Sequence, residues 1–562
     1  MSNPESSSPL VRYRIPLLIG LGILLYIPFL GLRDLWYPDE LDIAEVCRAM
    51  FLSGDWIAPR RMGTIWVDYP PMIYWVGTVS SHVFGTMSAF TLRLPNALTA
   101  IATVVLTCAA GTRWFSPRAG LWAGLVALTA LQFVLQAIGY RPDVLFTLFI
   151  AAGLFLYAEG VGERPRTWLR IAGFASFGLA MLAKGPLGLL LPGLVLTLWH
   201  GSRREWRRLL ELAPLSIVAL SVYLPWFVAC ARAMGADNIL YELYAQNFQR
   251  FFSGFRGHER PITYYLMNFW SDLWPWSWLV PVAIWWIWRT AWRRDRRVQL
   301  ALWWLGAFFV FLSLAVTKRQ LYLLPAYPAI ALLLAPWLEA VIQQPPGADA
   351  PSSKPVRAWT AGITITFVAL GLAFIAIGVA FEPIVERLEL NPQEVELAHL
   401  LRVPLIGTGV LLLAAAAWLG LTWRRKGPTT ALVRIPAVHV ALYVALQAWV
   451  MPTFDPTKTY RPQSRWISDQ IGVGTTFAMV HPERAMGMRK RGAFGYYTGS
   501  MVELLETQEQ VVEFLRQHPE SLVLVHDREA ATIFAGDEAG WRARVVRELR
   551  TGDHVYLVIR AP

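Results

Sequence analysis

Charged residues are scarce in this chain. They make up 16% of its 562 residues, whereas a soluble domain usually contains about 25%. Hydrophobic residues account for 55%, so the composition excludes an ordinary soluble protein and indicates an integral membrane protein. The 27 tryptophans agree with this class, because tryptophan is enriched at membrane–water interfaces.

Cysteine is also rare. The three cysteines, Cys47, Cys108 and Cys230, lie far apart in the sequence. This spacing provides neither a metal-binding motif nor a disulfide framework. The net charge is +12, but no nucleic-acid-binding motif is present, and the basic residues fall in short clusters between apolar runs. We therefore interpret them as topology signals and expect no nucleic-acid partner.

Apolar segments near the length of a membrane-spanning helix, about 20 residues, recur along the chain. The segments that we expect to span are 13–31, 93–111, 118–138, 143–160, 171–185, 186–199, 211–231, 272–289, 299–316, 320–341, 358–380, 402–423 and 433–451. The first lacks a small-x-small cleavage site, so we expect an uncleaved helix rather than a signal peptide. The sequence thus predicts a polytopic α-helical membrane protein with about thirteen transmembrane helices.

The segment 70–85, "PPMIYWVGTVSSHVFG", is ambiguous because it is short and begins with two prolines. If it does not span and Arg12 and Arg14 lie in the cytoplasm, every strong basic cluster also falls on the cytoplasmic side. If it spans, most of these clusters fall outside. We therefore predict a helix that lies at the membrane surface. The first outer loop, 32–92, then carries surface helices, and the C-terminus lies outside the cytoplasm.

The composition changes after residue 451. The stretches "TTFAMV", "SLVLVHD" and "HVYLVIR" are typical of strands, and "TQEQVVEFLRQHP" is typical of an amphipathic helix. These patterns predict two domains. A transmembrane domain occupies 1–451, and a small α/β domain occupies 452–562 on the extracytoplasmic side.

Two carboxylates on the predicted outer face are candidates for chemistry. In "YPDE", Pro38 favours the start of a helix and places Asp39 near its N-terminus, where it is ionised and able to accept a proton. The alternative is that Asp39 only caps the helix. In "GYRPDVLF", Asp143 stands where a span begins, a costly place for a carboxylate unless it is functional or paired with Arg141.

Cations also occur at the predicted outer boundary, where positive charge is disfavoured. They are Lys184 in "LAKGPLG" and Lys318 with Arg319 in "LAVTKRQLYLLP". Snorkelling to lipid headgroups is one explanation, and binding of an anion such as a phosphate is the other. The loop 244–266, "YAQNFQRFFSGFRGHERPITYYL", mixes aromatic and basic side chains, which suit sugars and phosphates, or else it is a polar loop with interfacial anchors.

Acids, cations and aromatics beside a bilayer point to a lipid-phosphate substrate. Its tail would lie among the spans, its phosphate would meet lysine or arginine, and a carboxylate would act on the group being transferred. This interpretation requires that Asp39 and the cations of the "TKRQ" turn share one extracytoplasmic pocket.

Several longer stretches resemble a known family. They are "YPDELDIAEVCRAMFLSGDWIAPRRMGTIWVDYPPMIYW", "LRLPNAL", "GLAMLAKGPLGLLLPGLV", "PWFV", "NFQRFFSGFRGHERPITYY" and "FLSLAVTKRQLYLLPAYPAIALL". In this order they resemble the aminoarabinose (lipid A) transferase family, which is related to the protein O-mannosyltransferases and has the membrane-embedded GT-C fold. The similarity covers roughly residues 10–340.

The resemblance implies an inverting glycosyltransferase in the bacterial inner membrane, with its active site facing the periplasm. Such enzymes move a sugar from a polyprenyl-phosphate donor to lipid A, lipopolysaccharide or another cell-envelope acceptor. Asp39 matches the position of the catalytic base, and Asp143 matches a second catalytic carboxylate. The substrate-binding candidates are Glu40, Asp68, Tyr69, Lys184, Arg256, His258, Arg260, Lys318, Arg319 and Tyr322.

The chain departs from the family pattern at several positions. Where the family often reads DExRY, this chain has "DELDI", with Asp42 and Ile43. Where the family often reads EKP, this chain has "VDYPP", with Asp68 and Tyr69. A histidine pair in the second long loop is reduced to His258. These changes leave the donor sugar and the acceptor open.

No cofactor is certain from the sequence. Asp68, His258 and Glu259 form a scattered set that offers only a weak possibility of a divalent metal site.

Two alternative functions remain. One is a glycosyltransferase of the same superfamily that modifies proteins or envelope glycans. The other is a transporter or flippase for lipid-linked sugars, which requires polar residues within the spans and broken helices near the midplane. Because the spans are nearly free of charge and the ionisable groups gather at one face, the sequence favours an enzyme at the membrane interface.

Overall fold

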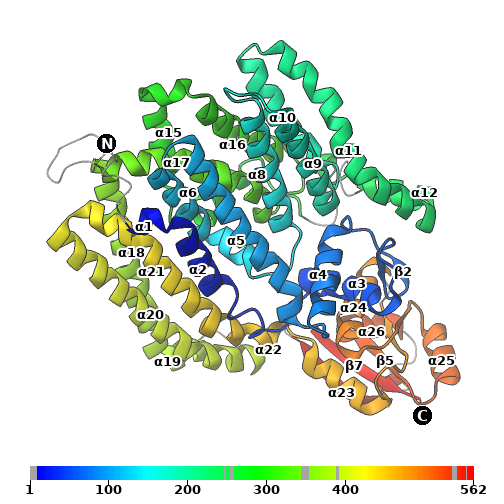
Figure 1. Ribbon diagram of the computed structural model, residues 1–562. Helices are drawn as coiled ribbons and strands as arrows, with labels where there is room; N and C mark the ends of the chain where they lie inside the picture. The colour runs from blue at the N-terminus through cyan, green and yellow to red at the C-terminus, as the bar shows by residue number, and fades with distance from the viewer. Residues whose placement is uncertain are drawn as a thin grey trace.

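The structure is a computed structural model that describes residues 9–245, 249–253, 258–343, 353–387, 392–481, 484–534, 541–542, 544–551 and 554–561. Most of the described chain is helical, and a small sheet lies at its C-terminal end (Figure 1). The fold class that the sequence predicts, a polytopic helical membrane protein with a small C-terminal α/β domain, is confirmed.

The N-terminal part is built from helices, with one short hairpin in the first outer loop. The helices are α1 (Pro9–Arg12), α2 (Arg14–Tyr26), α3 (Asp39–Ser53), α4 (Met72–Val83), α5 (Ala89–Trp114), α6 (Pro117–Thr129), α7 (Leu131–Ala137), α8 (Asp143–Gly160), α9 (Thr167–Lys184), α10 (Leu187–Ser202), α11 (Trp206–Met234), α12 (Ala236–Tyr244), α13 (Arg250–Phe252), α14 (Tyr264–Asp272), α15 (Leu279–Arg289), η3 (Ala291–Arg294), α16 (Arg296–Leu314), η4 (Gln320–Ala326), α17 (Tyr327–Ile342), α18 (Ser353–Val379), α19 (Phe381–Arg387), α20 (Pro392–Lys426) and α21 (Pro428–Ala445). The hairpin pairs β1 (Arg60–Arg61) with β2 (Thr64–Ile65).

Each apolar segment that was predicted to span overlaps at least one helix in the described part of the chain. The segment 118–138 falls on two helices, α6 and α7, with a bend of 66° between them, and within 272–289 the helix α15 begins only at Leu279. Among the described residues, eight helices are long and apolar enough to cross a membrane, and the bent pair α6–α7 forms a ninth candidate. The helices α2, α10 and α15 are apolar but shorter. The number of about thirteen spans stays a prediction.

The first outer loop contains the helices α3 and α4. Proline precedes both of them, at Pro38 and at Pro71. Gly54 follows the last residue of α3 and caps the helix, and its φ of 70° suits a residue without a side chain. The predicted helix start after Pro38 is therefore confirmed. With 12 residues, α4 is about 18 Å long, which is short of the ~30 Å hydrocarbon core and agrees with a surface helix.

Charged side chains at the two ends of the bundle belong to separate groups. At one end, Arg113 contacts Glu159 and Arg296 contacts Glu205, so segments that were predicted to be cytoplasmic lie together. Asp143 lies at the opposite end of α8 from Glu159. The helix α8 has 18 residues and is therefore about 27 Å long. The basic clusters near Glu159 and the carboxylate of Asp143 thus lie at opposite ends of the helix bundle.

The C-terminal domain has a five-stranded mixed sheet in the order β4-β3-β5-β7-β6. The strand β3 is parallel to β4 and β5, and β7 is antiparallel to β5 and β6. Its elements, with the short helices that lead into it, are η5 (Leu446–Val450), η6 (Met451–Phe454), α22 (Asp455–Lys458), α23 (Arg461–Ile471), β3 (Phe477–Val480), α24 (Arg484–Thr498), β4 (Val502–Leu505), α25 (Gln508–Gln517), β5 (Leu522–His526), α26 (Asp527–Ile533), β6 (Val545–Thr551) and β7 (His554–Arg560).

The C-terminal domain packs on the first outer loop, where α24 lies against α3 (Figure 1). Polar contacts fix this arrangement. Asp455 accepts hydrogen bonds from the backbone N–H of Asp34 and from Nε1 of Trp36, at 2.9 and 2.7 Å. Arg461 forms an ion pair of 2.7 Å with Asp34. The domain therefore supports the segment that leads directly into Asp39. The domain boundary at 451/452 stays a prediction.

Candidate functional site

Asp39 lies at the first position of α3 and is held by two arginines. Arg319 donates from Nη1 and Nη2 to the two carboxylate oxygens, at 3.0 and 2.8 Å, and Arg141 donates from Nη2 at 2.5 Å. Burial by itself lowers the pKa of Arg319, but the hydrogen bonds and the charge of Asp39 outweigh burial and hold that pKa above its usual value. The expected meeting of Asp39 with the "TKRQ" turn is confirmed for Arg319.

Asp143 pairs with Lys184 and not with its neighbour Arg141. Nζ of Lys184 donates to Oδ1 of Asp143, whose side chain is only 3% exposed. The same ammonium lies 4.3 Å from the ring centroid of Tyr322. The sequence offered an Arg141–Asp143 ion pair as an alternative to a functional role for Asp143. The structure has two separate pairs instead, Arg141 with Asp39 and Lys184 with Asp143.

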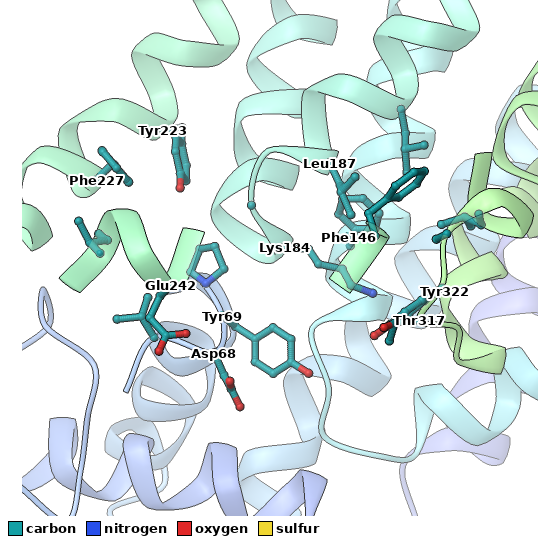
Figure 2. Close-up of a pocket in the computed structure, with 18 of the residues that line it drawn as sticks. Asp68, Tyr69, Phe146, Lys184, Leu187, Tyr223, Phe227, Glu242, Thr317 and Tyr322 are labelled. Carbon is teal, nitrogen blue, oxygen red and sulfur yellow. The ribbon is translucent and has the colours of Figure 1, made fainter. Parts of the chain in front are cut away.

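An apolar cavity opens beside Lys184 (Figure 2). Its empty space, open solvent included, is about 1050 Å³. Half of its lining residues lie on the helices α8, α10, α11, α12 and α16, and Asp68, Glu242 and Lys184 are the charged residues of the lining. The lining residues are Val67, Asp68, Tyr69, Pro70, Phe146, Lys184, Gly185, Leu187, Leu191, Tyr223, Trp226, Phe227, Ile239, Glu242, Phe251, Phe311, Leu312, Ala315, Thr317 and Tyr322.

Asp39 lines a second, polar cavity, whose empty space, open solvent included, is about 880 Å³. It shares Asp68, Tyr69 and Tyr322 with the apolar cavity, so these side chains form the boundary between the two. Figure 2 shows Asp68, Tyr69 and Tyr322 among the labelled side chains that line the apolar cavity. The residues that line the polar cavity are Pro38, Asp39, Asp42, Ile43, Trp66, Asp68, Tyr69, Tyr74, His258, Arg319 and Tyr322.

The segment 258–260 pairs with the turn before η4. Glu259 and Thr317 form an antiparallel bridge, and the backbone N–H of Lys318 donates to the carbonyl of His258 at 3.0 Å. This pairing carries His258 to the polar cavity. It also explains how two segments that lie 58 residues apart in the sequence, at Arg260 and Lys318, contribute to one site.

Lys318 and Arg260, two of the substrate-binding candidates, lie outside the described lining of the two cavities. Nζ of Lys318 is buried and donates to the backbone carbonyls of Arg260 and Ala315. Arg260 is exposed and donates to the carbonyl of Glu259. Neither side chain is among those that line the two cavities, because one fastens the turn and the other points outward. Arg256 lies outside the described residues.

Glu40, another substrate-binding candidate, is buried and is not among the described residues that line the two cavities. It forms ion pairs with Arg33 and Arg93, at 2.7 and 2.8 Å, and accepts a hydrogen bond from the backbone N–H of Trp36. Burial alone would raise the pKa of Glu40, but the two arginines hold it well below its usual range. Glu40 therefore joins α3 to α5 instead of lining a cavity.

The other acids of α3 have arginine partners as well. Asp42 lies 2.7 Å from Arg61, and Glu45 lies 2.7 Å from Arg48. Most acidic side chains of α3 are therefore held in ion pairs. Two of these acids, Asp39 and Asp42, also line the polar cavity.

The weak possibility of a metal site finds no support. Within the described residues, no group of three or more His, Cys, Asp or Glu side chains is arranged to hold a metal ion. Asp68 and His258 both line the polar cavity, whereas Glu259 does not.

Sequence reasoning did not assign Arg141, Trp66 or Tyr74 to the site. Arg141 stood out only as a neighbour of Asp143, and its true partner lies 102 residues away in the chain. Trp66 and Tyr74 flank the "VDYPP" stretch. The match of this stretch to a family motif was the one feature of the sequence that could have indicated these two aromatic residues.

Comparison with known proteins agrees with this picture. Residues 68–228 match the family model described as dolichyl-phosphate-mannose-protein mannosyltransferase. Over 332 residues the chain is 32% identical to undecaprenyl phosphate-α-4-amino-4-deoxy-L-arabinose arabinosyl transferase 2 of Pseudomonas fluorescens, which covers 58% of this chain and 59% of the relative. Over 329 residues it is 31% identical to the corresponding transferase of Edwardsiella ictaluri, covering 57% and 58%. The match thus spans less than two thirds of these relatives.

The fold is shared over a greater length. The crystal structure of ArnT from Cupriavidus metallidurans bound to undecaprenyl phosphate superposes with a TM-score of 0.77 at 22% identity, covering 97% of both chains, and its apo state gives the same values. The resemblance that the sequence indicated is therefore confirmed, and the fold is of the GT-C type. The chain is a multi-pass membrane protein.

Proposed function

We propose that this chain is a membrane glycosyltransferase that moves a sugar from a polyprenyl-phosphate donor to lipid A, lipopolysaccharide or another cell-envelope acceptor. The observation that carries the proposal is the position of Asp39. Asp39 lines a polar cavity that adjoins an apolar cavity, at the same end of the bundle as Lys184 and Arg319. This is the arrangement that a lipid-linked donor and a polar acceptor require.

The apolar cavity suits the donor. Aromatic and aliphatic walls from α10, α11 and α16 match a polyprenyl chain, since contact with such a chain removes apolar surface from a polar environment. The donor phosphate would lie where Lys184 meets Tyr322 and Thr317, within reach of Arg319. The undecaprenyl phosphate bound to ArnT from Cupriavidus metallidurans and the donor in the relatives' names belong to the same chemical class.

The transfer needs a base, a leaving group and alignment of the two. Asp39 would accept a proton from the acceptor as its oxygen attacks the anomeric carbon, and the phosphate would depart on the opposite side with inversion. Lys184 and Arg319 would neutralise the charge that develops on the departing phosphate. If the acceptor were a phosphate, it would already be ionised, and Asp39 would orient it more than deprotonate it.

Asp143 would act through Lys184 in this scheme. It is almost fully buried and is not among the described lining residues of either cavity, but its ion pair holds the ammonium of Lys184 beside Tyr322. We therefore assign Asp143 as a positioning residue, which differs from the catalytic carboxylate that the resemblance implied.

The proposed location is the bacterial inner membrane, with the site facing the periplasm. The basic clusters at Arg113 and Arg296 lie at the opposite end of the bundle, where the positive-inside rule places the cytoplasm. The C-terminal domain and the polar cavity are then both periplasmic.

A glycosyltransferase for proteins or envelope glycans is the second candidate, because the same donor cavity serves either acceptor. A flippase is disfavoured, since the Asp143–Lys184 pair lies where α8 begins and α9 ends instead of near the midplane.

The test compares cells that lack the gene with cells that carry the wild-type chain or Asp39→Asn. Mass spectrometry of polyprenyl-phosphate lipids should show a glycosylated donor that accumulates without the gene and with Asp39→Asn. Envelope lipids and glycans should lose a sugar in the same two strains. Equal donor levels and equal envelope glycosylation in all strains, with the protein present in membranes, would contradict the proposal.

A further inference from the structure

The hairpin β1–β2 of the first outer loop lies against the helix α24 of the C-terminal domain. The contact is made by two glycines, Gly492 and Gly495, which are three residues apart and therefore adjacent on the helix surface. A Cβ atom at Gly492 would lie 2.7 Å from Nη2 and 2.9 Å from Cζ of Arg61, and one at Gly495 would lie 2.7 Å from Sδ of Met62. Side chains of the hairpin thus occupy the space that larger residues on α24 would need.

The turn of this hairpin has an uncommon backbone conformation. Met62 and Gly63 both have positive φ, at 47° and 73°, as a two-residue type I′ turn requires. A residue with a side chain seldom adopts this conformation, which persists where surrounding contacts enforce it. Met62 is 5% exposed and lies on Gly495, and Arg491 of α24 donates a hydrogen bond to Oγ1 of Thr64. The C-terminal domain therefore holds the hairpin in its shape.

Arg61 connects this contact to the polar cavity. Its side chain is 1% exposed, and its Nη2 lies 2.7 Å from Oδ1 of Asp42. Its guanidinium carbon lies 4.8 Å from the centre of the Trp66 ring. Asp42 and Trp66 both line the polar cavity, and neither is among the described lining residues of the apolar cavity. One guanidinium therefore contacts both a carboxylate and an aromatic ring of the polar cavity wall.

The planar shape of arginine suits this place. A guanidinium can donate to a carboxylate from its edge while its flat face covers an aromatic ring. It also needs a flat support on its other side, which a glycine provides. Because Arg61 is enclosed, a methyl group at Gly492 would move the guanidinium relative to Asp42 and Trp66. Asp42 follows Asp39 by three residues and lies on the same face of α3, so this displacement would occur next to the proposed base.

We propose that Arg61 is a positioning residue for the acceptor, and that Gly492 of the C-terminal domain holds Arg61 in place. The inference rests on the proposed function, in which the polar cavity is the acceptor side of the site. The C-terminal domain is then a structural part of the acceptor site, although none of its described residues lines the cavity. Displacement of Arg61 moves Asp42 and Trp66 and weakens acceptor binding, whereas the donor cavity keeps its shape.

The test measures KM separately for the donor and for the acceptor. Cells that lack the gene supply both substrates, as a lipid extract that contains the glycosylated polyprenyl phosphate and as an envelope fraction that contains the unmodified acceptor. The full-length enzyme in vesicles is titrated with each fraction while the other is in excess. The variants are Gly492→Ala, Arg61→Lys and the double variant. The matched control is Gly420→Ala on α20, where an added Cβ atom meets nothing within 4 Å.

Gly492→Ala and Arg61→Lys should each raise the apparent KM for the acceptor fraction by about tenfold, the usual effect of losing one hydrogen bond to a charged group. Lysine keeps the charge but not the planar fork. The KM for the donor should change little. The double variant should resemble Arg61→Lys, because the added methyl group acts through the guanidinium. Gly420→Ala should behave as the wild type does.

An unchanged acceptor KM in the variants, shown to be folded by size-exclusion chromatography, would overturn the positioning role. Equal increases in both KM values would also overturn it, since a general structural defect affects both substrates. Additive increases in the double variant would separate Gly492 from Arg61. If Gly492→Ala does not fold, Arg61→Lys decides the question by the same difference between the two KM values.

Failure of the proposed function has a different signature. In that case the wild-type enzyme transfers no sugar between the two fractions, and no glycosylated polyprenyl phosphate accumulates in cells without the gene. The positioning role then fails with the function. If the wild type is active and the variants match it, the positioning role alone is wrong.

Discussion

Arg319 and Asp39 are 280 residues apart in the sequence and are joined by two hydrogen bonds of 3.0 and 2.8 Å. The arginine precedes η4, and the aspartate begins α3. Both residues line the polar cavity, and the pair places a cation and a base within one hydrogen-bond length. The first predictions concern this pair.

Asp39→Asn should lower transfer activity by about 10²–10⁴-fold, the usual contribution of a general base. The amide keeps the shape of the side chain but cannot accept the acceptor proton. Transfer is measured as conversion of a glycosylated polyprenyl phosphate in reconstituted vesicles. Size-exclusion chromatography should show that the variant is folded, and full activity in the folded variant would remove Asp39 from this role.

Arg319→Lys should lower turnover by at least about tenfold, although the charge is kept. Lysine is a point charge and cannot form the two parallel hydrogen bonds that orient Asp39. Arg319→Gln should be more severe because it also loses the charge that opposes the departing phosphate. Equal activity of the lysine variant and the wild type would show that charge alone matters at this position.

Asp143→Asn and Lys184→Met should be non-additive. If Asp143 acts by positioning Lys184, its removal should cost little once Lys184 is absent, and the double variant should be about as slow as Lys184→Met. The measurement is a double-mutant cycle on kcat/KM with the reconstituted enzyme. Additive losses would give Asp143 an independent part in the reaction.

Glu40→Gln should reduce stability by about 3–5 kcal/mol, because it leaves Arg33 and Arg93 buried without their counter-charge. The thermal midpoint of the detergent-solubilised protein should fall. Glu513→Gln, on an exposed helix, provides the matched control and should leave the midpoint nearly unchanged. A normal midpoint for Glu40→Gln would contradict the supporting role of Glu40.

The C-terminal domain should lose stability in acid because of His526. Burial and the nearby positive charge of Lys490 lower its pKa from 6.5 to about 4, and its Nε2 lies 3.2 Å from Nδ1 of His554. Since the unfolded chain binds this proton near pH 6.5 and the folded domain only near pH 4, stability is greatest above pH 6.5. It declines as the pH falls through the interval between these values.

Pulse proteolysis of the solubilised protein at pH 7.0 and 4.5 measures this effect through cleavage within 452–562. His526→Gln should show a smaller increase in cleavage on acidification than the wild type. An identical response of the two proteins would exclude His526 as the source.

The sequence by itself determined the class of the protein and the position of its key acid. Scarce charge and repeated apolar segments require a membrane protein, since the bilayer demands helices of a minimum length. Pro38 determined that α3 starts at Asp39, because proline suits the beginning of a helix and not its interior. Both conclusions depend on local chemistry, which a sequence displays.

Apart from the expected meeting of Asp39 with the "TKRQ" turn, only the tertiary structure decided which charges meet. Asp39 and Glu40 are neighbours, but successive helical side chains point about 100° apart, so one faces the cavity and the other the buried arginines. Lys318 and Arg319 are also neighbours, and the extended backbone at Arg319 turns successive side chains to opposite sides. Partner choice depends on segments brought together from distant parts of the chain, and no local pattern of residues contains that information.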